Sequence, residues 1–250
     1  MNNIIIIPTH MESQAVLQAL PNAVPEMGWN VPAWRAGDLL LVEPGIGPEL
    51  TAALLPRIEP LEPRVMWLFG WCGGLVPELG VGDLVLADAT IFADEPASRF
   101  PHPPAESLVA QVRSISEGLH LRLLVGPVLT SAHVLASSEQ KRAGATTGAV
   151  AVEMEAGPLA RWAAARSVRF VHLRVVLDPL TSPLPAIDLP ADAHGNVSLL
   201  KMLLYVLAHP AELPALWKLM QQAGVTQKTI RDVITALTQS GGPLAPLPRT

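Results

Sequence analysis

Hydrophobic residues in this chain form short continuous runs that alternate with segments of helical periodicity. The runs that predict buried strands cover residues 4–7, 39–42, 65–69, 81–88, 123–130 and 170–178. Apolar runs of this length, rich in branched side chains, are typical of strands covered on both faces. Helices are expected at residues 13–20, 50–55, 106–118 and 157–166. This alternation predicts an α/β protein of three layers, α/β/α, with a central mixed, largely parallel twisted sheet.

The C-terminal part has a different pattern. Residues 199–209 and 214–222 predict two further helices, and the first is apolar nearly all round. Such a helix is buried in protein or covers an apolar surface, for example an oligomer interface. We therefore expect one α/β domain at residues 1–195, a helical extension at 196–240 packed on the same domain, and a flexible tail at 241–250 that is rich in proline and glycine.

Acidic residues stand where predicted strands end. Glu155 follows a short strand and precedes an alanine-rich helix with Pro158 in its first turn, and Asp178 ends the next strand. This order suggests a right-handed βαβ unit with both strands parallel, so that Glu155 and Asp178 face one pocket at the carboxyl ends of the strands. Glu12 also follows a strand. The alternative interpretation is a helix cap and a loop acid, and spacing alone leaves both open.

Composition and missing motifs narrow the function. The net charge of −5 argues against binding to nucleic acid. A single cysteine, Cys72, excludes an internal disulfide, and the seven histidines lack the spacing of a zinc site, so we expect no metal. There is no P-loop, no full dinucleotide fingerprint and no serine-hydrolase elbow. Without a signal-peptide pattern or a run long enough to cross a bilayer, a cytoplasmic protein is expected.

Four motifs in this order resemble the nucleoside phosphorylase and nucleosidase superfamily over residues 4–185. They are Gly45-Ile46-Gly47, the pattern from Gly73 to Asp83 (GGLVPELGVGD), Val152 to Ala156 (VEMEA) and Arg174 to Asp178. The resemblance implies an enzyme that cleaves the N-glycosidic bond of a purine nucleoside, without a cofactor and with phosphate as the only co-substrate to consider. Departure of the base leaves an oxocarbenium-like sugar, as in glycoside hydrolysis.

The resemblance also implies roles for individual residues. Asp178 matches the acid that protonates the leaving base at N7, and Glu12 matches the glutamate that activates water in hydrolytic members. Glu155 matches the carboxylate that accepts hydrogen bonds from the ribose hydroxyls, and Met154 packs beneath the sugar. The other expected substrate contacts are Glu153, Gly73, Gly74, Trp71, His133 and Val134. A lone histidine such as His133 is also compatible with a purely structural role.

Two departures from the superfamily pattern concern the mechanism. Phosphorolytic members hold phosphate with a serine or threonine and an arginine, and this chain has Trp71 and Phe69-Gly70 at those places. The residue before the acid, usually a serine, is Leu177 here. These departures favour hydrolysis and leave phosphorolysis open. They also leave a non-enzymatic alternative, a nucleoside- or lipid-binding module on the same fold.

Within the superfamily, residues 178–185, 192–196 and 209–216 resemble the C-terminal part of the hopanoid-associated phosphorylases. The expected substrate is then adenosylhopane, a small-molecule purine nucleoside with a large apolar 5′ group, and transient contact with a membrane surface is expected. The alternatives are futalosine hydrolase, which residues 4–12 resemble, and methylthioadenosine/adenosylhomocysteine nucleosidase. Relatives in the superfamily imply a homo-oligomer, most simply a dimer.

Overall fold

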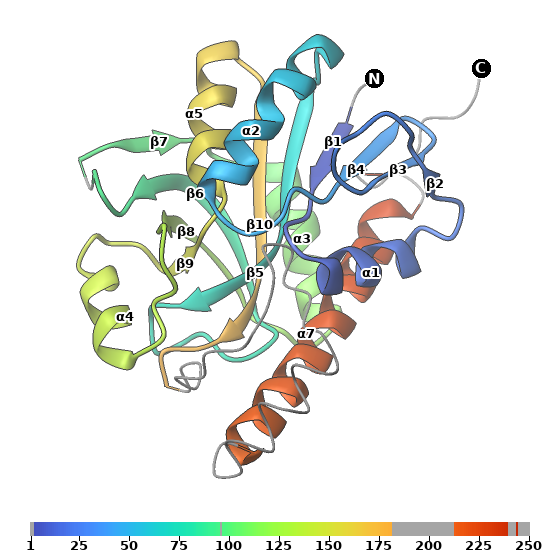
Figure 1. Cartoon of the computed structure of the whole chain (residues 1–250). Helices are drawn as coiled ribbons and strands as arrows, with labels where there is room; N and C mark the ends of the chain where they lie inside the picture. Colours follow the sequence, from blue (N-terminus) through green and yellow to red (C-terminus); the bar gives the residue numbers. More distant parts are fainter. Residues whose placement is uncertain (1–2, 96, 182–212, 240–243, 245–250) are drawn as a thin grey trace.

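The computed structural model describes residues 3–95, 97–181, 213–239 and 244, and Figure 1 shows their arrangement. The strands are β1 (Asn3–Ile6), β2 (Val24–Pro25), β3 (Ala33–Ala36), β4 (Leu39–Val42), β5 (Val65–Gly74), β6 (Leu84–Phe92), β7 (Arg99–Pro101), β8 (Leu123–Thr130), β9 (Ala151–Glu153) and β10 (Arg169–Asp178). The helices are α1 (His10–Ala19), α2 (Pro48–Ile58), α3 (Glu106–Gly118), α4 (Ser138–Ala145), α5 (Ala156–Arg166), α7 (Leu213–Thr238) and a 3₁₀ turn, η1 (Glu59–Leu61).

One mixed sheet contains all ten of these strands, in the order β10-β6-β8-β9-β5-β1-β4-β3-β2, with β7 beside β6. Strand β10 also pairs with β5, in parallel from Arg169 to Asp178. Strands β10, β6, β8, β9 and β5 therefore close into a ring, and β1 and β4 extend the sheet on the other side of β5. The ring brings the carboxyl ends of β5 and β10 together with the end of β9.

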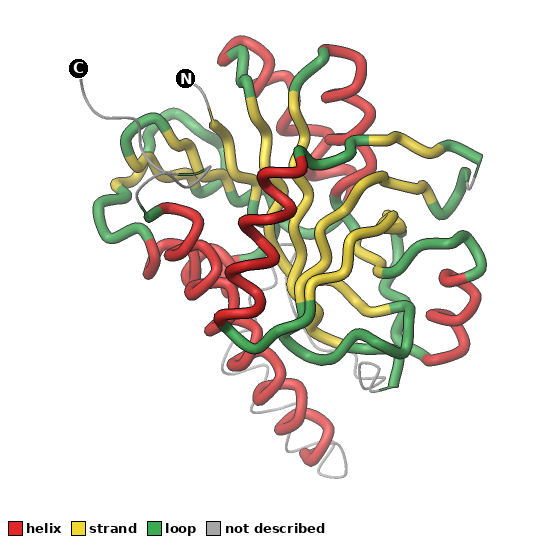
Figure 2. Tube along the Cα trace, turned by 180° about the vertical axis from the view of Figure 1, so that it is seen from behind, coloured by secondary structure: helices red, strands yellow, loops and turns green. Residues whose placement is uncertain are grey.

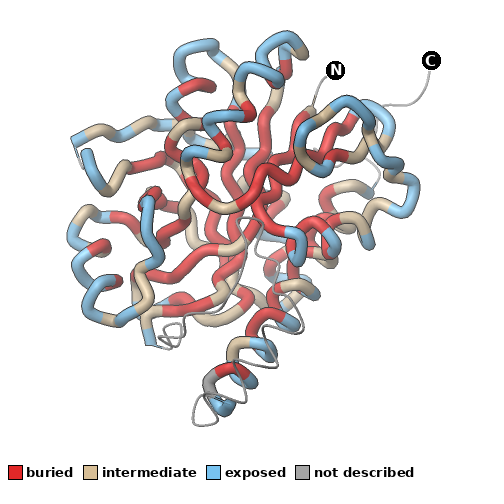
Figure 3. Tube along the Cα trace, in the orientation of Figure 1, coloured by how far each residue is buried: buried red, intermediate tan, exposed pale blue. Residues whose placement is uncertain are grey.

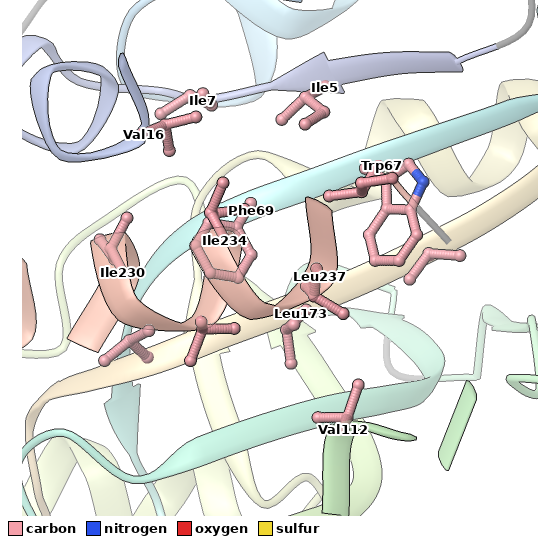
Figure 4. Close-up of a cluster of buried hydrophobic side chains, with 14 of the residues drawn as sticks. Ile5, Ile7, Val16, Trp67, Phe69, Val112, Leu173, Ile230, Ile234 and Leu237 are labelled. Atoms are coloured by element: carbon pink, nitrogen blue, oxygen red, sulfur yellow. The ribbon is translucent and has the colours of Figure 1, made fainter. Parts of the chain in front are cut away.

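Helices cover both faces of the sheet, as Figures 1 and 2 show. The run of isoleucines in and just after β1 shows this division: Ile5 and Ile7 pack in one cluster with α1, α3 and α7, and Ile4 and Ile6 pack in the other with α2 and α5. Figure 4 shows the first cluster, in which Ile230, Ile234 and Leu237 of α7 lie near β5 and β10. Figure 3 shows that the strands form the buried centre. The predicted α/β architecture with helices on both faces is confirmed.

Several predicted boundaries are wrong. The acid Glu12 is not in a loop, because α1 already begins at His10. The glycine-rich stretch after residue 69 is not a loop either, since β5 continues to Gly74 and pairs there with β9. Helix α4 was not predicted, and α7 extends well beyond the expected 214–222. The predicted helix at 199–209, the domain boundary at 195 and most of the tail lie outside the described residues.

The predicted parallel βαβ unit is also wrong in its strand directions. Strand β9 runs antiparallel to β5, through Gly73↔Val152 and Gly74↔Ala151, and β10 runs parallel to β5. The short β9 contacts only the last two residues of β5 and finds its parallel neighbour in β8 instead. Helix α5 still joins β9 to β10, so Glu155 and the end of β10 remain at the same edge of the sheet. No helix among the described residues is both long and apolar enough to cross a membrane.

A largely buried histidine just after β7 predicts acid sensitivity of the fold. His102 packs its ring on Phe170 at 4.9 Å between ring centres, and its Nε2 lies 2.9 Å from the hydroxyl of Thr90. Burial lowers the pKa of His102 to about 4 from its ordinary value of 6.5. The unfolded chain therefore takes up a proton first, so stability present above pH 6.5 is lost as the pH falls toward about 4, by roughly 3 kcal/mol for this group.

We expect His102→Phe, which keeps the aromatic packing, to reduce the loss of unfolding free energy between about pH 7 and about pH 4.5. Urea unfolding at the two pH values measures this difference, and His120→Asn, at an exposed histidine, is the control. An unchanged pH dependence in His102→Phe would contradict the buried, neutral state of His102.

Candidate active site

A cavity of about 150 Å³ opens at the carboxyl ends of β1, β5 and β10. The residues that line it are Pro8, Thr9, Glu12, Ile46, Trp71, Cys72, Gly73, His133, Val134, Leu135, Val152, Glu153, Met154, Glu155, Leu177 and Asp178. The cavity therefore brings together every residue that the sequence suggested for a site except Gly74. A Cβ at Gly74 would meet the backbone of Pro179 at 3.3 Å and Leu79 at 3.4 Å, which places this glycine in packing behind the cavity.

Glu12 is fixed by the start of helix α1. Thr9 is the N-cap: its hydroxyl oxygen accepts from the Glu12 amide at 3.3 Å, and the Glu12 carboxylate accepts from the Thr9 amide at 2.8 Å, which forms a capping box. The Thr9 hydroxyl also donates to this carboxylate at 2.6 Å. The other oxygen of the carboxylate accepts from the Trp71 amide at 2.5 Å. Burial raises the pKa of Glu12, while the Thr9 hydroxyl and Arg174 oppose this effect. The side chain is thus oriented toward the cavity and is a stronger base than an exposed glutamate.

Arg174 of β10 is the cation around which three buried acids gather. Its guanidinium donates to Glu153 and, at 3.0 Å, to Glu155, and it lies close enough to Glu12 to affect the pKa of that group. One positive charge does not neutralise three carboxylates. Burial and the neighbouring acids consequently raise the pKa of Glu155, although Arg174 lowers it.

Glu153 and Glu155 differ in what they offer a ligand. The Glu153 carboxylate accepts from the Thr130 hydroxyl at 2.5 Å, from the amides of Glu155 at 2.9 Å and Ala156 at 2.8 Å, and from Arg174. Its oxygens are occupied by the protein, so Glu153 supports the site although it was expected to contact substrate. Glu155 has fewer partners, namely Arg174 and the Gly47 amide at 3.1 Å.

The two glycines of the 45–47 motif allow the contact between the Gly47 amide and Glu155. Gly45 and Gly47 have φ angles of +106° and +109°, which only glycine adopts readily. This backbone directs the Gly47 amide at Glu155. The motif therefore positions an acid of the site.

Asp178 lies against a fully buried lysine. Lys141 of α4 places its Nζ 2.5 Å from Asp178 Oδ2 and also donates to the Asp178 backbone carbonyl. Lysine is almost never completely buried unless it is paired, so this ion pair explains why Lys141 is found inside the protein. The lysine does not line the cavity, but it fixes the carboxyl group that does.

Gly70 is required where Glu12 and Arg174 approach β5. A Cβ added at Gly70 would lie 2.6 Å from Glu12 Oε1 and 2.8 Å from Arg174 Nη1. We expect Gly70→Ala to displace both side chains, to cost about 1–3 kcal/mol of stability and to reduce activity about 100-fold. Urea unfolding and initial rates measure these effects. Gly224→Ala in α7, where an added Cβ meets nothing within 4 Å, is the matched control and should leave activity unchanged.

Sequence reasoning missed several supporting residues, among them Arg174, Lys141 and Thr9. Lys141 lies in a polar helix that carries no pattern beyond its capping box of Ser137 and Gln140, so nothing in the sequence indicated its partner 37 positions away. Thr9 carried a usable signal, because a threonine three residues before Glu12 is a capping-box pattern.

The fold and the cavity define an α/β protein with an acidic ligand site at the carboxyl edge of its sheet. Residues 6–200 match the Phosphorylase superfamily, and the chain belongs to this family. The chain is 26% identical to a 5′-methylthioadenosine/S-adenosylhomocysteine nucleosidase of Baumannia cicadellinicola, over 58% of this chain and 70% of the relative.

Solved structures share the fold. The nucleosidase of the same name from Neisseria meningitidis, in complex with methylthio-immucillin-A, has a TM-score of 0.67 at 17% identity and covers 95% of this chain and 100% of its own. Futalosine hydrolase of Helicobacter pylori has a TM-score of 0.66 at 17% identity and covers 93% of this chain and 97% of its own.

Proposed function

We propose that this protein hydrolyses the N-glycosidic bond of a purine nucleoside. The observation that carries the proposal is that Glu12 and Glu155, which follow strands β1 and β9, and Asp178, which ends β10, line one cavity. Relatives named as nucleosidases support the same reaction class.

Each acid has a role that suits its surroundings. Glu12 takes a proton from the water that attacks C1′ of the ribose, since a fixed, buried carboxylate with a raised pKa is an effective general base. Asp178, whose carboxylate is paired with Lys141 in the free protein, takes up a proton from solvent when the nucleoside binds and delivers it to N7 of the base while the bond from C1′ to N9 breaks and its electrons pass to the purine. Glu155 accepts hydrogen bonds from the ribose hydroxyls, and Met154 lies beside the sugar.

The charge of the cavity supports water over phosphate as the nucleophile. The described lining of the cavity contains four acidic residues and contains no lysine or arginine. The nearest guanidinium, that of Arg174, already donates to two carboxylates and to the Trp71 carbonyl. A phosphate dianion placed here would face carboxylates without a compensating cation.

The relatives favour a 5′-thioadenosine substrate over adenosylhopane, the substrate expected from the C-terminal sequence. Methylthioadenosine and adenosylhomocysteine are named for the sequence relatives, and futalosine for a structural one. The cavity of about 150 Å³ is smaller than the roughly 300 Å³ of typical small-molecule sites, so a bulky 5′ group would extend beyond the described lining.

One observation keeps a nucleoside with a large apolar 5′ group as the second candidate. Helix α7 exposes four apolar side chains, whose exposed fractions are 45–66%: Leu213, Trp217, Met220 and Val225. A large exposed apolar surface marks contact with a partner, a membrane surface or an apolar ligand. Formation of a homodimer and transient membrane contact remain proposals on the same ground.

The decisive experiment incubates the full chain separately with methylthioadenosine, adenosylhomocysteine, futalosine and adenosylhopane, with and without phosphate, and measures the free base. We expect adenine release from methylthioadenosine without phosphate. Release that requires phosphate would replace hydrolysis with phosphorolysis. Tight binding of these nucleosides without any base release would instead identify a binding module.

A further inference from the structure

The orientation of Arg174 depends on a residue outside the cavity. Arg174 is fully buried, and each of its guanidinium nitrogens has an acceptor. Nη2 donates to Glu153 and Glu155, and Nη1 donates to the Trp71 carbonyl at 3.2 Å. The N–H at Nε donates to Nε2 of His172 at 2.9 Å.

This contact fixes the state of the His172 ring. A guanidinium N–H only donates, so Nε2 of His172 must accept, and the proton of the neutral ring must be on Nδ1. Burial, the charge of Arg174 and the ring of His102 together lower the pKa of His172. His172 Nδ1 is buried and has no hydrogen-bond partner among the described residues, so no described contact other than that with Arg174 selects this tautomer.

A neutral acceptor suits this position better than an acid. Three carboxylates already surround Arg174. A fourth acid at Nε would add another buried negative charge to the group that includes Glu155. The imidazole gives the Nε N–H an acceptor without changing the charge of the site.

We propose that His172 is a positioning residue of this site: its neutral, Nδ1-protonated ring fixes the Arg174 guanidinium, which in turn holds Glu155 where it meets the ribose hydroxyls. The inference rests on the proposed function for its last step. It makes recognition of the sugar depend on a side chain that does not line the cavity.

Two substitutions separate positioning from folding. His172→Leu removes the acceptor and leaves a buried guanidinium N–H without a partner, while His172→Gln offers an amide oxygen at a similar distance along the side chain. We expect His172→Leu to raise KM for methylthioadenosine about 10-fold with a smaller change in kcat, and His172→Gln to restore most of the loss.

The measurement that is specific for positioning is how strongly the enzyme prefers a nucleoside with both ribose hydroxyls to one that lacks one of them. Wild type should prefer methylthioadenosine to its 2′-deoxy and 3′-deoxy analogues, and in His172→Leu this preference should shrink about 10-fold because Arg174 no longer holds Glu155 in place and only the Gly47 amide does. A purely structural role would lower the active fraction equally for all three nucleosides. An undiminished preference in His172→Leu would overturn the proposal.

A second measurement needs no turnover. Nitrogen-15 NMR of the histidine rings, with the His172 signals assigned by their absence in His172→Gln, should show a proton on Nδ1 and none on Nε2 at neutral pH. A proton on Nε2, or a charged ring, would overturn the inference. If the expected tautomer is found but wild type releases no base, the proposed function fails and the assignment of His172 as the acceptor for Arg174 stands.

Discussion

Asp178→Asn should reduce base release by about 10³-fold, because the amide has no acidic proton to deliver to the leaving purine. The substitution keeps the size and shape of the side chain at the end of β10. Initial rates with the best nucleoside of the panel measure the effect. Base release at the rate of the wild type would remove Asp178 from the role of general acid.

The same substitution should also destabilise the protein, and a second change separates the two effects. Asp178→Asn leaves the ammonium of Lys141 buried without its counter-charge, which costs about 3–5 kcal/mol when one partner of such a pair is removed. Replacing both residues, with Asp178→Asn and Lys141→Met, removes the buried charge as well. We expect the double variant to recover most of the unfolding free energy and none of the activity. Recovery of activity together with stability would show that Asp178 acts only through folding.

Glu12→Gln is the second substitution with a large expected effect. The amide does not take a proton from water, so we expect hydrolysis to fall by about 10²–10⁴-fold. In the wild type the base must be ionised, so activity should fall as the pH decreases through the raised pKa of Glu12. In Glu12→Gln the part of this acidic limb that Glu12 causes should be lost, and the part that Glu155 causes, whose pKa burial also raises, should remain. A pH series of kcat/KM for both proteins measures it.

A nearby glutamate provides the matched control for this substitution. Glu43 is also buried at the end of a strand and accepts from the Ser13 hydroxyl at 2.5 Å, but it does not line the cavity. Glu43→Gln should affect stability without removing hydrolysis. If Glu12→Gln retains base release and this release requires phosphate, the hydrolytic mechanism is wrong.

The sequence was sufficient to predict the architecture because the decisive signal is local. Uninterrupted apolar runs such as residues 4–7 and 39–42 identify strands covered on both faces, and both became central strands. The directions of the strands were harder to predict from the sequence. The pairing of β9 with β5 depends on how a ring of strands closes, and a three-residue segment carries no periodicity that reveals its neighbours.

The candidate site, like the fold, could be predicted only in part from the sequence. The acids at strand ends were visible in the sequence, and Glu12, Glu155 and Asp178 do meet in one cavity. Their partners were harder to predict, because Lys141 is far in the sequence from Asp178, and the Trp71 carbonyl is far from Arg174, so that only the fold brings them together. The direct contact expected for Glu153 illustrates the limit, since motif resemblance does not show that α5 and Arg174 already use its oxygens.

The capping box at the start of α1 has a consequence for the timing of activity. The carboxylate that would activate water is the same one that holds the first turn of a helix. If the Glu12 side chain leaves the site, the first turn of α1 loses its capping box. Loss of activity and fraying of α1 should therefore show the same dependence on denaturant concentration. A protein in which the first turn of α1 has unfolded should be inactive at denaturant concentrations that leave the central sheet folded.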